Sequence, residues 1–168
     1  EITIAKQKPG KYLRFSVYGN IEGCYEQHLT TLYVTLPNFN KYQFLRDGFG
    51  IYKDVQDAWM NFKLEDVKDK LTDELYNMYE SQLATLEVKG ERNVMKDITM
   101  QRSYLKDVTN QNGILTITTG YIIDQYDYID EPNTGRLIRG NSSQKMRVVY
   151  EMKFRMSIDE YAQTTHCP

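Results

Sequence analysis

The sequence is poor in the residues that most often carry chemistry. Of its 168 residues, only two are cysteine and two are histidine. Cys24 and Cys167 can form one bridge at most, which excludes a disulfide scaffold, and we expect this pair to be unbridged. His28 and His166 both lie outside the region where we expect the main domain, so a histidine base is not expected in its cleft.

Long hydrophobic runs and a surplus of one charge are also missing. No stretch approaches the run of about 18 apolar residues that a membrane-spanning helix needs. The net charge is −2, from 21 basic and 23 acidic residues without a basic stripe, so no nucleic-acid partner is expected. The length favours a single domain with a real core. Because the chain starts at Glu1 and not at methionine, we expect it to be a piece of a longer protein.

We expect residues 1–40 to be a linker or a partly ordered N-terminal extension. Helical periodicity dominates the region that follows them. Apolar spacings of three and four predict a helix over Lys41 to Met60, a short one within Asn61 to Leu71, and a third that begins after Thr72. Thr72 is expected to cap the third helix, and Gly90 to end it. The apolar faces comprise Leu45, Phe49, Tyr52, Val55 and Trp59, then Leu64, Val67 and Leu71, then Leu75, Tyr79, Leu83 and Leu86.

After Gly90 the hydrophobic period changes to two residues, which predicts strands. In Met146 to Met156, six apolar residues alternate with mostly charged ones, and Ile114 to Asp124 alternates similarly. Asn112-Gly113 predicts a hairpin turn, so Asp97 to Val108 should be the antiparallel partner of the strand that follows.

A further turn is predicted at Pro132, Asn133 and Gly135, before a short strand at Arg136 to Arg139. Helices followed by a strand meander predict an α+β fold, with three N-terminal helices packed on a curled antiparallel sheet. Long strands must curl to bury an apolar face, so we expect a cone with an open end. This cone domain is predicted over residues 41–158, with a tail at 159–168.

Several local motifs resemble the bacterial members of the Tim44-like family, named for a mitochondrial import-motor tether. They are Val55-Gln56-Asp57-Ala58-Trp59-Met60-Asn61-Phe62, Leu71-Thr72-Asp73-Glu74-Leu75-Tyr76, Gln82-Leu83 and Asn93. The resemblance covers about Asn38 to Met156 and rests on packing motifs. It implies the nuclear-transport-factor-two-like cone fold, and a membrane-anchored parent protein of which this chain is a soluble, membrane-associated domain.

A second resemblance lies at the end of the chain. His166-Cys167-Pro168 is similar to the start of the zinc knuckle that follows the domain in Firmicutes members of the family. A structural zinc site needs about four ligands, and one thiol cannot supply them. No metal or cofactor is therefore expected in these residues.

The only dense acidic cluster is Asp124, Asp127 and Asp130, interleaved with Tyr126 and Tyr128. Alternation places Asp124 and both tyrosines opposite Tyr121 and Ile123, so we interpret the cluster as a solvated edge and not as a catalytic or metal site. No phosphate loop, nucleophile elbow or metal-ligand pair is present. The chain is therefore expected not to be an enzyme. The alternative is an isomerase or dehydratase that uses a cleft carboxylate.

Tyrosine is abundant, with 14 residues, and several are predicted to lie on the interior face. A tyrosine offers an apolar body and a polar tip, which suits either a core or a ligand groove. We predict a non-catalytic binding or scaffold domain that holds a protein, peptide or lipid in an apolar, aromatic cleft; a homodimer through an outer sheet face is a further possibility. The predicted cleft residues are Trp59, Tyr79, Leu83, Tyr121, Ile123, Tyr150, Met152 and Phe154.

Overall fold

The structure is a computed structural model that describes residues 3–6, 12–15, 17–18, 32 and 35–158. The predictions on both cysteines and both histidines lie outside these residues. The helices and strands include, in chain order, β1 (Thr3–Lys6), β2 (Tyr12–Phe15), β3 (Val17–Tyr18), α2 (Lys41–Met60), the 3-10 helix η1 (Leu64–Lys70), α3 (Asp73–Lys89), β4 (Arg92–Gln111), β5 (Ile114–Asp130) and β6 (Leu137–Ser157).

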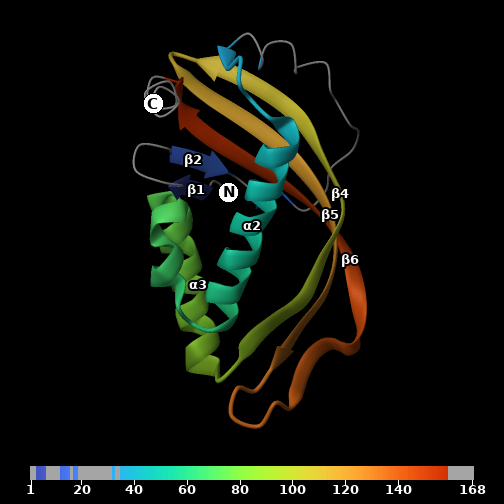
Figure 1. Ribbon diagram of the computed structural model, residues 1–168. Helices are drawn as coiled ribbons and strands as arrows, with labels where there is room; N and C mark the ends of the chain where they lie inside the picture. The colour runs from blue at the N-terminus through green and yellow to red at the C-terminus, as the bar shows by residue number, and fades with distance from the viewer. Residues whose placement is uncertain (1–2, 7–11, 16, 19–31, 33–34, 159–168) are drawn as a thin grey trace.

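Three long strands form an antiparallel meander. The sheet order is β3-β6-β5-β4, in which β3 contributes only two residues, while β1 and β2 form a separate two-stranded ribbon. The sheet curls, and α2 lies along its concave side (Figure 1). The α+β class with helices and a curled antiparallel sheet is thereby confirmed.

The strands continue beyond the predicted bounds. β5 runs past Asp124 to Asp130, and the predicted short strand at Arg136 to Arg139 is the beginning of β6. Pairing with β4 persists to Arg92 opposite Asp130. The hydrogen bonds between strands join backbone groups and so do not require apolar side chains. Hydrophobic alternation alone therefore underestimated the lengths of the strands.

The helix boundaries agree closely with the predictions. Helix α2 spans Lys41–Met60 and is capped by Asn40, whose side chain accepts a hydrogen bond from the Gln43 N–H. In α3, the Thr72 hydroxyl accepts from the Leu75 N–H at 3.1 Å, and Gly90 ends the helix in the left-handed region at φ 67°. These caps satisfy backbone groups that a helix end leaves without partners.

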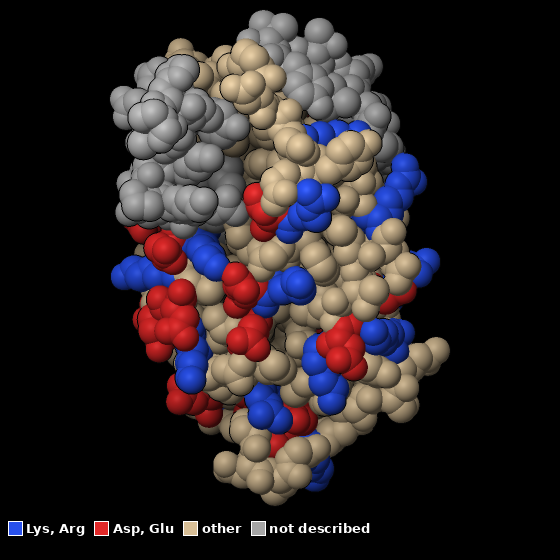
Figure 2. Space-filling view, in the orientation of Figure 1, with Lys and Arg blue, Asp and Glu red and all other residues tan. Residues whose placement is uncertain are grey.

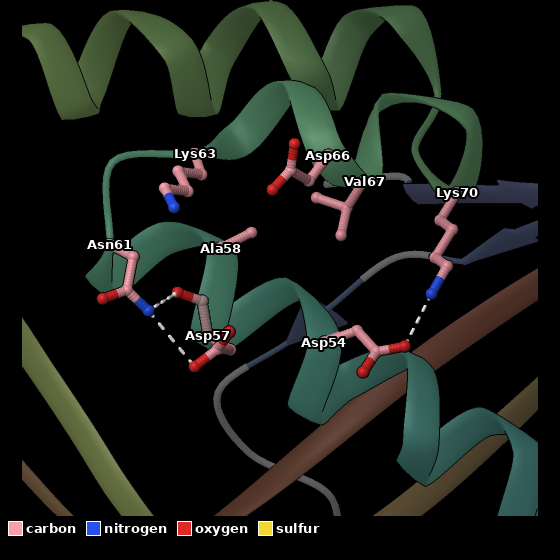
Figure 3. A pocket seen from close by; sticks show the side chains of 8 residues that line it. All are labelled: Asp54, Asp57, Ala58, Asn61, Lys63, Asp66, Val67 and Lys70. Carbon is pink, nitrogen blue, oxygen red and sulfur yellow. Dashed lines mark hydrogen bonds and ion pairs between the residues drawn. The ribbon is translucent and has the colours of Figure 1, made fainter.

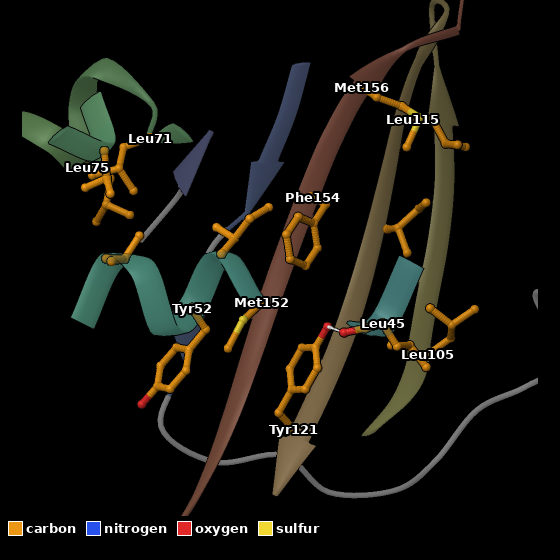
Figure 4. Close-up of a cluster of buried hydrophobic side chains, with 14 of the residues drawn as sticks. Leu45, Tyr52, Leu71, Leu75, Leu105, Leu115, Tyr121, Met152, Phe154 and Met156 are labelled. Atoms are coloured by element: carbon orange, nitrogen blue, oxygen red, sulfur yellow. Dashed lines mark hydrogen bonds between the residues drawn. The ribbon is translucent and has the colours of Figure 1, made fainter. Parts of the chain in front are cut away.

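One hydrophobic core lies between the helices and the sheet (Figure 4). It contains Leu75, Leu83, Leu115, Ile117, Met152 and Phe154, with Trp59, Tyr79 and Val148 packed against it. The inward direction of Met152 and Phe154, each 0% exposed, confirms the predicted face of β6. Met146 departs from that prediction because it is 46% exposed, beyond the part of the strand that the core covers.

Helix α2 approaches the sheet closely at Gly48. The Tyr121 hydroxyl of β5 donates a hydrogen bond to the Leu45 carbonyl oxygen at 2.9 Å. A Cβ atom on Gly48 would overlap that hydroxyl and lie 2.9 Å from Phe154 Cζ. The glycine that weakens the helix by propensity therefore provides the space in which two aromatic side chains pack.

Candidate binding site on the concave side of the sheet

The eight predicted cleft residues divide into two groups by exposure. Tyr121, Ile123, Met152 and Phe154 are 0% exposed, and Leu83 is also buried, so these five side chains are enclosed in the core. The remaining three, Trp59, Tyr79 and Tyr150, are partly exposed. Whether any of the eight contacts a ligand stays a prediction, and the partly exposed group is the one that a ligand can reach without displacing the core.

Aromatic rings meet in pairs around this exposed group. The Trp59 and Tyr79 rings join the end of α2 to α3, with centroids 5.3 Å apart in an edge arrangement. The Tyr52 and Tyr150 rings join α2 to β6, with centroids 4.9 Å apart. Both spacings lie in the range of favourable aromatic contact.

A chain of polar side chains links these two aromatic pairs. The Tyr52 hydroxyl donates to Gln125 Oε1 at 2.8 Å, and Gln125 Nε2 contacts Asp127 Oδ2 at 3.5 Å. On the other side of the carboxylate, Asn93 Nδ2 donates to Asp127 Oδ1 at 2.8 Å. Asn93 Oδ1 in turn accepts a hydrogen bond from Trp59 Nε1 at 3.2 Å.

Strand alternation explains how these polar groups come to face inward. Tyr121, Ile123 and Gln125 are buried odd-numbered positions of β5, and Asp127 continues that face. The β4 ladder places Met95 opposite Asp127. Gln125 is 0% exposed yet polar, and its hydrogen bonds to Tyr52 and Asp127 offset the cost of burying an amide.

The interpretation of the acidic cluster as a solvated edge is wrong for Asp130. Asp130 is 4% exposed and binds Arg92 through two hydrogen bonds of 2.9 and 2.7 Å. Asp127 lies on the inner face within the polar chain. Asp124 lies on the outer face, where its hydrogen bonds with Arg147 hold the pKa of its carboxyl below the ordinary range.

The Tim44-like domain model matches residues 26–164. The chain belongs to the Tim44-like domain family. This is a family of membrane-associated, protein-binding domains that are in general non-catalytic. No curated protein matches the chain. Within the described part of this Tim44-like domain, no helix combines the length and the apolar character required to span a membrane.

The Tim44-like domain also has a surface pocket of about 220 Å³ between α2 and η1 (Figure 3). Ala58 and Val67 form part of its wall, and charged or amide groups line the rest. Lys70 Nζ contacts Asp54 Oδ2 at 2.6 Å, and Asn61 Nδ2 contacts Asp57 Oδ1 at 3.2 Å. One ion pair, Lys70 with Asp54, thus occupies part of the rim of this pocket.

Charged side chains on the visible face of the Tim44-like domain are interleaved, with basic and acidic groups beside one another (Figure 2). Among the residues that the structure describes, no three His, Cys, Asp or Glu side chains gather closely enough to hold a metal ion. The concave polar chain is thus an arrangement of one carboxylate, amides and aromatic groups. Such groups can bind and orient a ligand.

Burial favours the protonated form of the inward tyrosines. Burial and the neighbouring Tyr150 raise the pKa of Tyr52 far above its ordinary value, and burial also raises the pKa of Tyr121 and of Tyr150. In the unfolded chain these phenols lose their protons near pH 10. Their contribution to stability is therefore complete below about pH 10 and falls as the pH rises above it.

We therefore expect the free energy of unfolding to fall steeply above about pH 10, and the Tyr52→Phe variant to show a shallower fall. Urea unfolding measured between neutral and strongly alkaline pH tests this. Tyr42→Phe is the matched control, since Tyr42 is 69% exposed on the same helix. An equal alkaline slope in wild type and Tyr52→Phe would show that Tyr52 is not protected from ionisation.

Proposed function

We propose that this Tim44-like domain is a non-catalytic binding module that holds a segment of a partner protein on the concave side of its sheet. The observation that carries the proposal is the partial exposure of Trp59, Tyr79 and Tyr150 beside a closed core. Partly exposed aromatic side chains supply large contact area at low entropic cost. Met95, Met100 and Val148, also partly exposed and on the same face by strand register, add adaptable apolar surface.

The resemblance in sequence extends this proposal to the parent protein. A curled sheet with α2 along its concave side is compatible with the nuclear-transport-factor-two-like cone. We further propose that the parent is a bacterial protein anchored in a membrane, with the cone domain at 41–158 and a zinc knuckle after it. In such a protein the domain would bring a partner to the membrane surface.

The alternative function is a small-molecule isomerase or dehydratase that uses a cleft carboxylate. Asp127 favours it, because a carboxylate on the inner face beside tyrosines could abstract a proton. Against it, the groups that contact Asp127 are the amides of Asn93 and Gln125, and neither can take part in acid–base exchange. The binding function therefore fits the contacts better.

Trp59 makes the proposal directly testable because it is the only tryptophan of the chain and lies in the proposed site. We expect apolar peptides to shift its fluorescence and its indole N–H resonance saturably. Tyr150→Ala should weaken this binding about tenfold, the effect of losing a good aromatic contact of about 1.4 kcal/mol.

Tyr42→Ala, which removes a tyrosine that is 69% exposed, is the control and should bind as wild type does. Circular dichroism verifies that both variants are folded. If peptides leave Trp59 unchanged while a short-chain phospholipid shifts it, the ligand is a lipid and the protein-segment proposal fails. Turnover of a small carbonyl substrate that disappears in Asp127→Asn would instead establish the enzymatic alternative.

A further inference from the structure

Asp127 differs from every other carboxylate of β5 and β6 in having no cationic partner within the described part of the chain. Asp124 contacts Arg147 at 2.7 Å, Asp130 contacts Arg92 at 2.7 Å, and Glu151 contacts Lys106 at 2.9 Å. Among the described residues, no Lys or Arg nitrogen forms an ion pair with Asp127, although it is partly buried. A carboxylate that loses water on folding is costly unless a cation compensates it.

The Asp127 carboxylate is nevertheless held in one orientation. Asn93 occupies Oδ1 at 2.8 Å, and Gln125 contacts Oδ2 at the longer distance of 3.5 Å. An ionised carboxylate can accept about four hydrogen bonds, so acceptor positions remain open on both oxygens. Gln125 is itself fixed by the hydroxyl of Tyr52 at 2.8 Å. The result is an oriented negative charge with spare acceptors.

Two amide side chains link this charge to aromatic groups. Asn93 connects it to Trp59, and Gln125 connects it to Tyr52, whose ring packs on that of Tyr150. An ammonium or guanidinium group is attracted both to a carboxylate and to the faces of such rings. An apolar or anionic ligand would gain nothing from the carboxylate. The combination therefore selects for a cation.

We propose that Asp127 is the recognition residue for a lysine ammonium or arginine guanidinium group on the protein segment that the concave side binds. This inference rests on the proposed function, and it adds the chemical class of the ligand: an apolar segment that carries a basic side chain. The polar chain through Asn93 and Gln125 positions the carboxylate, and the aromatic groups contact the apolar stem of the basic side chain.

The test uses two matched peptides, with Trp59 as the reporter. One is a short leucine- and alanine-rich peptide with a central lysine, and its twin carries N-acetyllysine, which has no charge. The wild-type domain should bind the lysine peptide about tenfold more tightly than its twin, a difference of about 1.4 kcal/mol. Asp127→Asn should bind the two peptides equally.

Asp124→Asn is the matched control, because it removes the same charge from the same strand on the outer face. It should keep the wild-type preference for the lysine peptide. Equal binding of both peptides by wild type, or a preference that persists in Asp127→Asn, would overturn this inference and leave the proposed function standing. If neither peptide shifts the Trp59 signal, the proposed function fails and this inference fails with it.

Thermal unfolding without ligand gives a second readout. Asp127 accepts hydrogen bonds from two amides but pairs with no cation of the described chain, so Asp127→Asn should lower the midpoint temperature by less than the loss of an ion-paired carboxylate does. Asp130→Asn should lower the midpoint, because it leaves Arg92 without its buried partner. A fall with Asp127→Asn as large as that with Asp130→Asn would show that Asp127 is structural and overturn the inference.

Discussion

We expect the Phe154→Ala variant to lose about 3–5 kcal/mol of unfolding free energy, the range for a fully buried aromatic side chain. Phe154 is 0% exposed, and its ring meets that of Phe44 edge-on, with centroids 5.2 Å apart. The ring also packs beside α2 at Gly48. Removing it opens a cavity where the helix and the sheet meet, which neither element can fill by a small shift.

Urea unfolding at neutral pH measures this loss. Ile114→Ala is the control, since Ile114 is 41% exposed at the start of β5, and it should cost well under half as much. A loss below about 1 kcal/mol for Phe154→Ala would mean that the ring is not enclosed as described.

The second large effect is expected at Gly48. Alanine normally stabilises a helix relative to glycine by about 0.5–1 kcal/mol. At Gly48 the new methyl group would overlap the Tyr121 hydroxyl and crowd the Phe154 ring. We expect Gly48→Ala to destabilise the domain by about 1–3 kcal/mol, as overpacking in a core usually does.

Gly50, two residues further along α2, provides the opposite case. A Cβ atom there meets nothing within 4 Å, so Gly50→Ala should stabilise the domain through helix propensity alone. Calorimetric midpoints of the two variants should therefore move in opposite directions. Stabilisation by both substitutions would show that α2 does not approach β5 so closely.

Much of the fold follows from local sequence signals. The bounds of α2, the Thr72 cap, the Gly90 end and the hairpin turn at Asn112-Gly113 were all predictable, because each depends on residues close together in the chain. The close approach at Gly48 was not predictable, since it depends on Tyr121 and Phe154, which lie far away in sequence. From sequence alone, a glycine within a helix indicates only a lower helix propensity, because the residues that pack against it are not known.

In the candidate site too, features that depend on local sequence were predictable and features that depend on distant residues were not. Aromatic residues of the inner face were predictable from alternation, and so in principle was Asp127, which continues the inward series of Gln125 on β5. The neighbouring acidic residues favoured the interpretation of a solvated edge, so the inward direction of Asp127 was not predicted. Its isolation from cations could not be predicted, because it depends on which arginines and lysines reach Asp124, Asp130 and Glu151.

The distance along the chain between α2 and its partners determines the order in which this domain can assemble. Tyr121 lies 76 residues after Leu45, and Gln125 lies 73 residues after Tyr52, whereas β4, β5 and β6 are joined by short turns. During synthesis α2 leaves the ribosome before any strand that covers its apolar face. Its docking therefore waits for the later hairpins, and contacts this distant are characteristic of slow folding steps. Until the later strands are complete, the apolar side of α2 lacks the sheet that buries it in the finished domain.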